Sequence, residues 1–252
     1  MERTFVAEVE AWIADDPDPT TAAALQKLFD AGDEATLRTY FNGFLQFGTA
    51  GLRGPNGPGP SCMNRAVVGR AAAGIAAYMK ARGMKRVVIG RDARHGSQEY
   101  AEESAQIFSG AGMEVFLLPR ALPTPVLAYA TTALKADVGI MVTASHNPPQ
   151  DNGYKVYIGP DADGIAYASS QIIAPTDGFI AAEITKITSL SSQPRGREWT
   201  VLDEELIDEY IDRTSVLASR PGTLKIVYTA MHGVGTQTLA EVFKRASFPD
   251  LI

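Results

Sequence analysis

The spacing of apolar positions predicts helices in the first forty residues. The apolar residues before position 15 fall on one helical face. The segment 15–19 interrupts this spacing with two prolines, and Thr20 or Thr21 stands where a second helix needs its N-cap. A third, short helix is expected over residues 34–40. We therefore expect residues 1–40 to form a helical extension packed on the main domain.

After residue 40 the pattern changes to short apolar runs that alternate with longer amphipathic segments. Short apolar runs are typical of buried strands, and the longer segments between them of helices. This alternation implies right-handed crossovers and a mostly parallel sheet with helices on both faces, a three-layer α/β fold. The expected elements are a helix over 66–82, a strand over 86–90, a helix over 98–108, a strand over 114–118, a helix over 125–134 and a strand over 137–142.

Two further segments complete the expected first domain. Residues 155–158 predict a strand at the edge of the sheet, and residues 179–187 predict a closing helix. The domain then covers residues 41–190. The polar stretch that follows contains a proline and a glycine and predicts a linker over residues 191–202.

From residue 203 the chain begins a second, similar α/β unit. Asp203 is expected to cap a helix, which is followed by a strand over 224–228, a glycine-bearing loop and a helix over 237–245. A parallel strand requires a partner reached by a crossover, and the returning strand is missing or only begun at 248–252. We therefore expect residues 203–252 to be the start of a truncated second domain.

Composition and charge narrow the class of protein. The 252 residues are 45% hydrophobic and 21% charged, as in ordinary globular proteins. The net charge of −6 disfavours nucleic-acid binding but allows a phosphorylated small molecule, which needs only a local Arg and Lys cluster. Cys62 is the single cysteine, so no internal disulfide is expected. An acidic N-terminus and the lack of a long apolar run predict no signal peptide, no membrane span and a cytoplasmic location.

The strongest candidate for chemistry is the polar segment 143–148, directly after the last strand predicted for the parallel sheet. Reactive groups in open α/β sheets lie where strands end at their carboxyl edge. Ser145 lacks the flanking glycines of a serine-hydrolase turn, and its neighbour His146 points away from it in an extended segment. A zinc phosphatase is disfavoured because the chain has only three histidines. A serine that carries a phosphoryl group fits better.

Several blocks resemble one family. Thr143-Ala-Ser-His-Asn-Pro148, followed by Asn152-Gly-Tyr-Lys155, is similar to the phosphoserine signature of the α-D-phosphohexomutases, which include phosphoglucomutase and phosphomannomutase. Phe47-Gly-Thr-Ala-Gly-Leu-Arg-Gly54, followed by Met63-Asn64, resembles the family's first active-site loop, and Gly90-Arg-Asp-Ala-Arg94 resembles a third block. The N-terminal helices and the first loop most resemble the phosphoglucomutase/phosphopentomutase branch.

The resemblance implies an intramolecular phosphotransferase. Ser145 would be phosphorylated in the resting enzyme and would give its phosphoryl group to a sugar monophosphate. The resulting bisphosphorylated sugar would reorient and return its other phosphoryl group, so that phosphate moves between C1 and C6 of a hexose. A phosphoserine carries about −1.5 to −2 charges at neutral pH, so Mg²⁺ is expected on the phosphate of Ser145. Glucose 1,6-bisphosphate or a similar molecule is the expected activator.

The resemblance also assigns roles to individual residues. Lys155 would lie beside the transferring group and assist proton transfer, and Arg53 would lie at the reaction centre. The alternatives are a solvated surface lysine and an arginine that caps a neighbouring helix. His146 would orient the loop or touch substrate, unless it is purely structural. The expected substrate-binding residues are Thr143, Asn147, Arg91 and His232.

The charged residues 91–94 are open to two interpretations. An internal ion pair among Arg91, Asp92 and Arg94 that holds the loop is preferred, and contact with a phosphate is the alternative. Asp161-Ala-Asp-Gly164 has two carboxylates but is interpreted as a turn and not as a metal site.

The chain departs from the complete family pattern. The family's metal loop lies in the second domain, sugar recognition in the third and the phosphate-binding loop in the fourth. None of these is found here, so the remaining Mg²⁺ ligands are expected in the missing part of the second domain, and this chain alone is expected to be nearly inactive. The expected partner is a sugar phosphate, with no nucleic acid and no membrane. Whether the sugar is glucose, mannose or a pentose stays open, as does the oligomeric state.

Three alternatives remain at this point. The chain could be a non-catalytic module that binds a sugar phosphate or a partner. The full-length protein could be a phosphopentomutase. It could also hydrolyse sugar phosphates and release inorganic phosphate.

Overall fold

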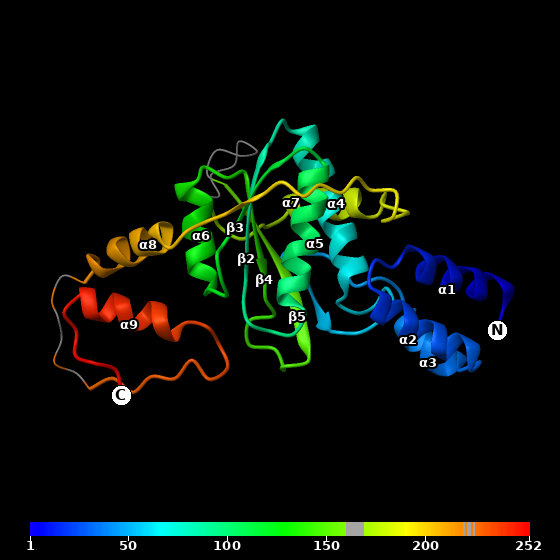
Figure 1. The fold of residues 1–252 in the computed structure, drawn as a ribbon, viewed down its shortest axis with the longest axis horizontal. Helices are drawn as coiled ribbons and strands as arrows, with labels where there is room; N and C mark the ends of the chain where they lie inside the picture. The colour runs from blue at the N-terminus through cyan, green and yellow to red at the C-terminus, as the bar shows by residue number, and fades with distance from the viewer. Residues whose placement is uncertain (160–168, 219, 221–222, 224) are drawn as a thin grey trace.

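The computed structural model describes residues 1–159, 169–218, 220, 223 and 225–252, and their centre is a six-stranded sheet (Figure 1). Its order is β1-β5-β4-β2-β3-β6. Strands β4, β2, β3 and β6 run parallel, whereas β5 is antiparallel to both β4 and β1. The strands are β1 (Leu52–Pro55), β2 (Arg86–Arg91), β3 (Glu114–Leu117), β4 (Val138–Val142), β5 (Asp151–Ile158) and β6 (Thr200–Val201). The predicted mostly parallel α/β fold is confirmed.

Helices cover both faces of the sheet and extend beyond it on either side (Figure 1). They are α1 (Arg3–Asp15), α2 (Pro19–Asp30), α3 (Glu34–Tyr40), α4 (Arg65–Ala81), α5 (Ser97–Gly110), α6 (Thr124–Ala133), α7 (Thr176–Ile184), α8 (Glu205–Ser215) and α9 (Thr236–Arg245). In the described parts of the chain, every helix is too short or too polar to cross a bilayer. The elements predicted between residues 66 and 142 are confirmed to within two residues at each end.

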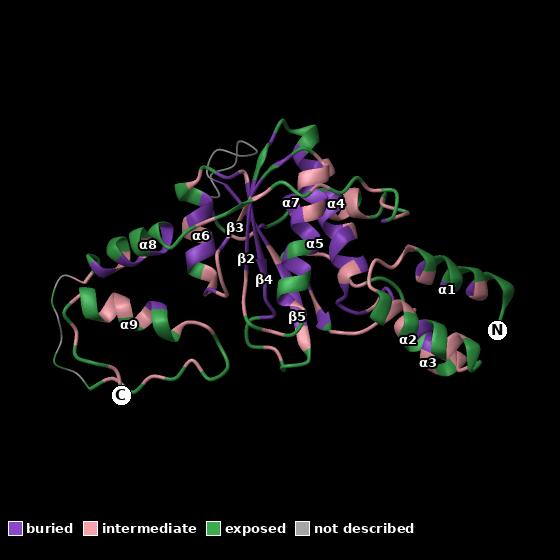
Figure 2. Cartoon of the chain, in the orientation of Figure 1, coloured by how far each residue is buried: buried purple, intermediate pink, exposed green. Residues whose placement is uncertain are grey.

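Two apolar clusters, one on each face, hold the sheet between its helices. In β2, Val87 and Ile89 pack into the cluster that also contains α4 and α5, while Val88 packs into the cluster with α6 and α8. This follows from the period of two in a strand, which sends successive side chains to opposite faces. Figure 2 shows the result as a buried sheet lined by the buried sides of α4, α5 and α6. Burial on both faces explains why these strands are continuous apolar runs.

Small residues let α4 approach its neighbours closely. This helix is rich in alanine, a strong helix former, and the side chain of Asn64 caps it by accepting from Val67 N at 2.8 Å. A Cβ at Gly74 would lie 2.7 Å from Ile184 N, so only glycine allows the backbones of α4 and α7 to pack so tightly at this point. The packing places α7 beside α4 and closes this face of the sheet.

The N-terminal extension is tied to the main domain through Asp15. Its carboxylate accepts hydrogen bonds from Leu190 N at 2.7 Å and Ser191 N at 2.8 Å, and pairs with Arg70 at 2.9 Å. Burial raises the pKa of Asp15, but the hydrogen bonds from residues 189–191 outweigh burial and lower the pKa to about 2. Asp15 is therefore ionised at neutral pH, which keeps the ion pair intact.

Two sequence-based expectations, the edge strand at 155–158 and the cap of the second helix, are wrong. The strand at 155–158 is not an edge strand, since β5 begins at Asp151 and lies between β1 and β4. Asp18, not Thr20 or Thr21, caps α2, because Asp18 accepts from Thr20 N at 2.9 Å and Pro19 takes the first helical position. The described residues 225–228 are not part of the six-stranded sheet, although Ile226 and Tyr228 are hydrogen-bonded to Ile252.

The edge of the sheet is instead β1, in the segment expected to be a loop. Its sequence Leu-Arg-Gly-Pro contains two residues that are rare in strands. Pairing with β5 overrides this local preference, and proline is tolerated on an edge strand. Arg53 consequently stands on a strand beside β5, with Gly153 as its partner.

Residues 203–252 lie next to the sheet where they begin, at helix α8. The N-cap position of α8 is Glu204 and not the predicted Asp203, although the side chain of Asp203 accepts from Glu205 N at 3.1 Å. Helix α8 packs on α6 through Leu206, Ile207 and Ile211. Arg245 of α9 pairs with two aspartates of α8. Ile252 N donates to Ile226 O, and Tyr228 N donates to Ile252 O, both at 3.0 Å, which is the pattern of a parallel pair. The division into domains at 191–203 stays a prediction.

Candidate functional site

Two loops meet at the carboxyl ends of β2 and β4. These strands are parallel neighbours, and Asp92 N, the first residue after β2, donates to Val142 O at 3.0 Å. The loop 92–96 leads into α5, and the loop 143–150 leads into β5. Because both loops leave the same edge, side chains far apart in the sequence lie together there. This edge holds most of the residues that the sequence singles out.

Asp92 connects the two loops. Its Oδ1 accepts from Arg94 N at 3.0 Å and from Ser97 Oγ at 2.7 Å. Its Oδ2 accepts from Thr143 Oγ1 at 2.7 Å, and Arg94 Nε lies 3.3 Å from the same oxygen. The predicted ion pair within residues 91–94 is therefore confirmed for Asp92 and Arg94, and it reaches across to the loop after β4.

Ser145 projects from the loop after β4. Its side chain is exposed, while the preceding Thr143 and Ala144 are buried. The φ angle of Ser145 is +60°, a left-handed conformation that costs a residue with a Cβ about 1–2 kcal/mol. Ser145 N donates to Thr143 Oγ1 at 3.0 Å, so the strained turn is held by the hydroxyl that Asp92 orients. The backbone is fixed and the hydroxyl faces solvent, which suits a nucleophile or a group carrier.

Arg53 reaches the Ser145 loop from the edge strand. Its Nη1 donates to Asn147 Oδ1 at 3.2 Å, and Asn147 Nδ2 donates to Asp151 Oδ2 at 2.8 Å. Arg53 is half-buried and stands opposite Gly153 on the neighbouring strand. A cation is thus positioned beside the loop, and the described residues engage its guanidinium only through Nη1, which leaves its other N–H groups to bind an anion.

Lys155 lies on β5 on the same face of the sheet as Arg53. It stands two residues after Gly153, the partner of Arg53, and is paired with Met141 of β4. Burial lowers the pKa of Lys155, and the positive charge of Arg53 lowers that pKa further. Lys155 therefore loses its proton at a lower pH than a solvated lysine does, which suits proton transfer.

Some of the other predicted site residues belong to or contact the Ser145 loop, and others have no such contact among the described residues. His146 is exposed on the Ser145 loop. Thr143 is buried, and its hydroxyl is used within the site. Arg91 is half-buried and donates to Asp92 O at 3.3 Å and Gln98 Oε1 at 3.4 Å. His232 lies on the exposed loop before α9, and among the described residues no hydrogen bond or ion pair joins it to the Ser145 loop. The roles of all these residues stay predictions.

Two residues of this edge received no role from the sequence. Asp151 supports Asn147, as described above, from four residues further along the chain. Asn152 is fully buried, and its Nδ2 donates to His95 O at 2.9 Å and Ser97 Oγ at 3.0 Å. A buried amide that joins the 92–96 loop to β5 would show in the sequence only as an asparagine near the serine motif. Its contacts to the His95 carbonyl and the Ser97 hydroxyl leave no pattern in the sequence.

The residues around Ser145 do not by themselves form a Mg²⁺ site. In the described ranges there is no group of three or more His, Cys, Asp or Glu side chains placed to hold a metal ion. The Asp92 and Asp151 carboxylates are engaged by Thr143, Ser97, Arg94 and Asn147. A phosphate on Ser145 would supply a single ligand, whereas Mg²⁺ takes six. Asp161 and Asp163 lie outside the described residues.

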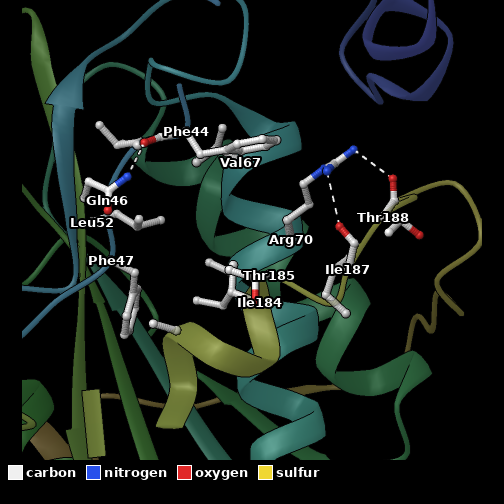
Figure 3. Close-up of a pocket in the computed structure, with 13 residues that line it drawn as sticks. Phe44, Gln46, Phe47, Leu52, Val67, Arg70, Ile184, Thr185, Ile187 and Thr188 are labelled. Atoms are coloured by element: carbon white, nitrogen blue, oxygen red, sulfur yellow. Dashed lines mark hydrogen bonds between the residues drawn. The ribbon is translucent and has the colours of Figure 1, made fainter. Parts of the chain in front are cut away.

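A separate cavity of about 580 Å³ lies between α4, α7 and residues 44–47 (Figure 3). Its lining is mostly apolar and includes Phe44, Leu52 and Ile184. Arg70 contributes a positive charge to the lining of this cavity. It donates to Ile187 O at 3.2 Å and to Thr188 O at 3.4 Å, and it pairs with Asp15. Its charge is already compensated, so this cavity is a poor site for a phosphorylated molecule compared with the Ser145 loop.

The fold and this edge together define a three-layer α/β domain that presents a serine on a strand-end loop, with an arginine bound to the same loop and a lysine on the neighbouring strand β5. Residues 45–177, more than half of the chain, match the family described as "Phosphoglucomutase/phosphomannomutase, alpha/beta/alpha domain I". The chain therefore belongs to the phosphoglucomutase/phosphomannomutase family, within the α-D-phosphohexomutase superfamily.

Individual relatives agree with this assignment. A Haemophilus influenzae protein named "Probable phosphomannomutase" is 46% identical over 191 residues, covering 74% of this chain and 38% of that protein. Mouse phosphopentomutase is 33% identical over 264 residues, covering 97% of this chain and 42% of that protein. A phosphoglucomutase/phosphomannomutase family protein from Burkholderia thailandensis has a similar structure, with a TM-score of 0.64 and 25% identity over 82% of this chain and 43% of that one. The chain thus spans about two fifths of the length of these relatives.

Proposed function

We propose that this chain carries the phosphoryl-transferring part of a sugar-phosphate mutase, in which Ser145 holds the phosphoryl group in transit. The observation that carries the proposal is the exposed Ser145 hydroxyl on a fixed backbone turn, with Arg53 bound to the same loop and Lys155 on the neighbouring strand. Family membership and the names of the relatives support it.

In the proposed step, a hydroxyl of a sugar monophosphate attacks the phosphorus of phosphorylated Ser145. A new oxygen–phosphorus bond forms while the bond from phosphorus to Ser145 Oγ breaks. The proton of the sugar hydroxyl ends on Ser145 Oγ, and Lys155 passes it on. The bisphosphorylated sugar then reorients and the same step runs in reverse with its other phosphate, which leaves an isomeric monophosphate and restores the phosphoserine.

The neighbouring residues take distinct parts in this step. Arg53 binds oxygens of the transferring group by its free guanidinium edge, since it already anchors Asn147 by one N–H. Thr143 and Asn147 shape the loop, and His146 contacts substrate from its exposed position. Arg91 and His232 are proposed as more distant substrate contacts. Mg²⁺ is expected to bind the phosphate of Ser145, with its other ligands outside the described residues.

The sugar is proposed from the relatives. Transfer between C1 and C6 of a hexose agrees with the name of the Haemophilus influenzae relative, and transfer on a pentose agrees with the name of the mouse relative, which covers more of this chain. We take the hexose first and the pentose as the alternative. A non-catalytic binding module and a hydrolase are the competing functions.

A two-stage transfer experiment separates these functions. The chain is first incubated with glucose 1,6-bisphosphate and Mg²⁺, freed of small molecules, and then mixed with glucose 6-phosphate, mannose 6-phosphate or ribose 5-phosphate. We expect the phosphoryl group to move to one of these sugars as a bisphosphate. Repeated turnover is expected to be slow, because the relatives contain more than half of their length beyond the matched region. Release of inorganic phosphate instead would indicate a hydrolase, and no transfer at all would leave a binding module.

A further inference from the structure

Arg94 lies beneath the Ser145 loop and donates almost entirely to its backbone. Nη1 donates to Pro148 O at 2.8 Å and Asp151 O at 3.0 Å. Nη2 donates to Ser145 O at 3.0 Å and Asn147 O at 2.8 Å. Nε pairs with Asp92 Oδ2 at 3.3 Å. One side chain from the loop after β2 thus holds three carbonyls of the loop after β4 and the carbonyl of Asp151, the first residue of β5.

These contacts use the full hydrogen-bonding capacity of the guanidinium. An arginine side chain has five N–H donors, and here four face carbonyl oxygens and the fifth faces a carboxylate. No N–H of Arg94 is left for a phosphate. The alternative in which the charged cluster contacts phosphate therefore does not apply to Arg94, and its charge acts only through the loop.

The sequence of the loop is compatible with carbonyls that point toward Arg94. Asn147 and Pro148 are each followed by proline, which has no N–H. Their carbonyls face Arg94 without forcing a donor on the next residue to lose its partner. The Pro148-Pro149 pair thus has a physical reason that the serine motif alone does not give.

The hydrogen bond between the Ser145 carbonyl and Arg94 also determines the direction of the next N–H group. In a trans peptide the C=O of one residue and the N–H of the next point in opposite directions. Because Ser145 O faces Arg94, the N–H of His146 faces away from it, and this N–H makes no hydrogen bond with any described residue. Ser145 itself is held at φ +60° by the same arrangement.

We infer that Arg94 is a positioning residue for phosphoryl transfer: through four backbone carbonyls it fixes Ser145 and presents the His146 N–H as a donor to the phosphoryl group. This inference rests on the proposed function of Ser145. It assigns Arg94 no contact with the sugar or the phosphate. Loss of its hydrogen bonds should therefore slow transfer without weakening the binding of the donor.

The test compares Arg94→Lys with Arg120→Lys. Lysine keeps the charge but has three donors and no planar fork, so at least two carbonyls lose their partner. Arg120 pairs with exposed Glu204, has no hydrogen bond to the Ser145 loop among the described residues, and serves as the matched control. The rate of Ser145 phosphorylation by glucose 1,6-bisphosphate is followed by intact mass over a range of donor concentrations. We expect Arg94→Lys to lower the saturating rate about tenfold to a hundredfold with the half-saturating concentration unchanged, and Arg120→Lys to stay within twofold.

Chemical rescue distinguishes positioning from general loss of structure. In Arg94→Ala we expect added guanidinium ion, but not methylammonium, to restore part of the rate, with the thermal unfolding midpoint little affected by either ion at that concentration. If Arg94→Ala does not fold, the Arg94→Lys comparison decides alone. Wild-type rates in Arg94→Lys, or a loss seen only in the half-saturating concentration, would overturn the inference while the proposed function stands. Failure of the wild-type chain to accept phosphate would overturn both.

Discussion

Replacing Lys155 by methionine is expected to slow phosphoryl transfer at Ser145 by about 10²- to 10³-fold. Methionine keeps much of the side-chain volume but removes both the charge beside the developing phosphate and the amine that passes the proton. Burial first and the charge of Arg53 second lower the pKa of Lys155. In the wild-type chain the transfer rate should therefore rise with pH, and reach its plateau below the pH at which an ordinary lysine titrates.

A matched variant separates the two parts of the Lys155 role. Lys155→Arg keeps a positive charge but does not release a proton in the accessible pH range, since the pKa of arginine lies well above that of lysine. If proton transfer matters most, Lys155→Arg should lose as much rate as Lys155→Met and lose the pH dependence. The measurement is the rate of Ser145 phosphorylation between about pH 6 and 10. A Lys155→Met chain that reacts within threefold of wild type would remove Lys155 from the mechanism.

Gly51→Ala is expected to destabilise the chain by about 2–5 kcal/mol. Gly51 has a φ of +72°, a conformation that costs an alanine about 1–2 kcal/mol. A Cβ there would also overlap the carbonyl oxygen of Tyr154 on β5, where the edge strand pairs through Leu52. Relief of this overlap must push β1 away from β5, which costs a further one to three kcal/mol or so. Arg53 moves with β1, so transfer should slow as well.

Gly48→Ala is the control for this variant, because it lies in the same turn. A Cβ at Gly48 meets no atom within 4 Å. Its unfolding free energy should change by less than about 0.5 kcal/mol, as for ordinary surface substitutions. Urea unfolding of the two variants and the wild type measures the difference. Equal midpoints for Gly51→Ala and Gly48→Ala would show that the approach of β1 to β5 is not tight.

The part of the fold that the sequence predicts well is the part with two buried faces. The runs at 86–90, 114–118 and 137–142 each have a charged first residue and only apolar residues or glycine after it, because helices cover both sides, so their pattern is strong. The strand β1 has no such pattern. It contains a glycine and a proline and exists because β5 pairs with it, which is a tertiary effect that local preference does not contain.

The candidate site also has a part that the sequence predicts and a part that it does not. Ser145, Lys155 and Arg53 belong to recognisable motifs and can be named from the sequence. The hydrogen-bonding role of Arg94 cannot be predicted from the sequence, because four of its five acceptors are backbone carbonyls, which every residue has. Nor does the sequence give the strained turn at Ser145, which depends on the hydroxyl of Thr143 and, through it, on Asp92.

The most direct test of the central claim is the mass of the intact chain after incubation with glucose 1,6-bisphosphate and Mg²⁺, followed by peptide mapping. Transfer of one phosphoryl group adds ~80 Da. We expect this increase on the peptide that contains Ser145, and we expect none in a Ser145→Ala chain treated in the same way. An unchanged mass, or an increase that maps to another residue and persists in Ser145→Ala, would contradict Ser145 as the phosphoryl carrier.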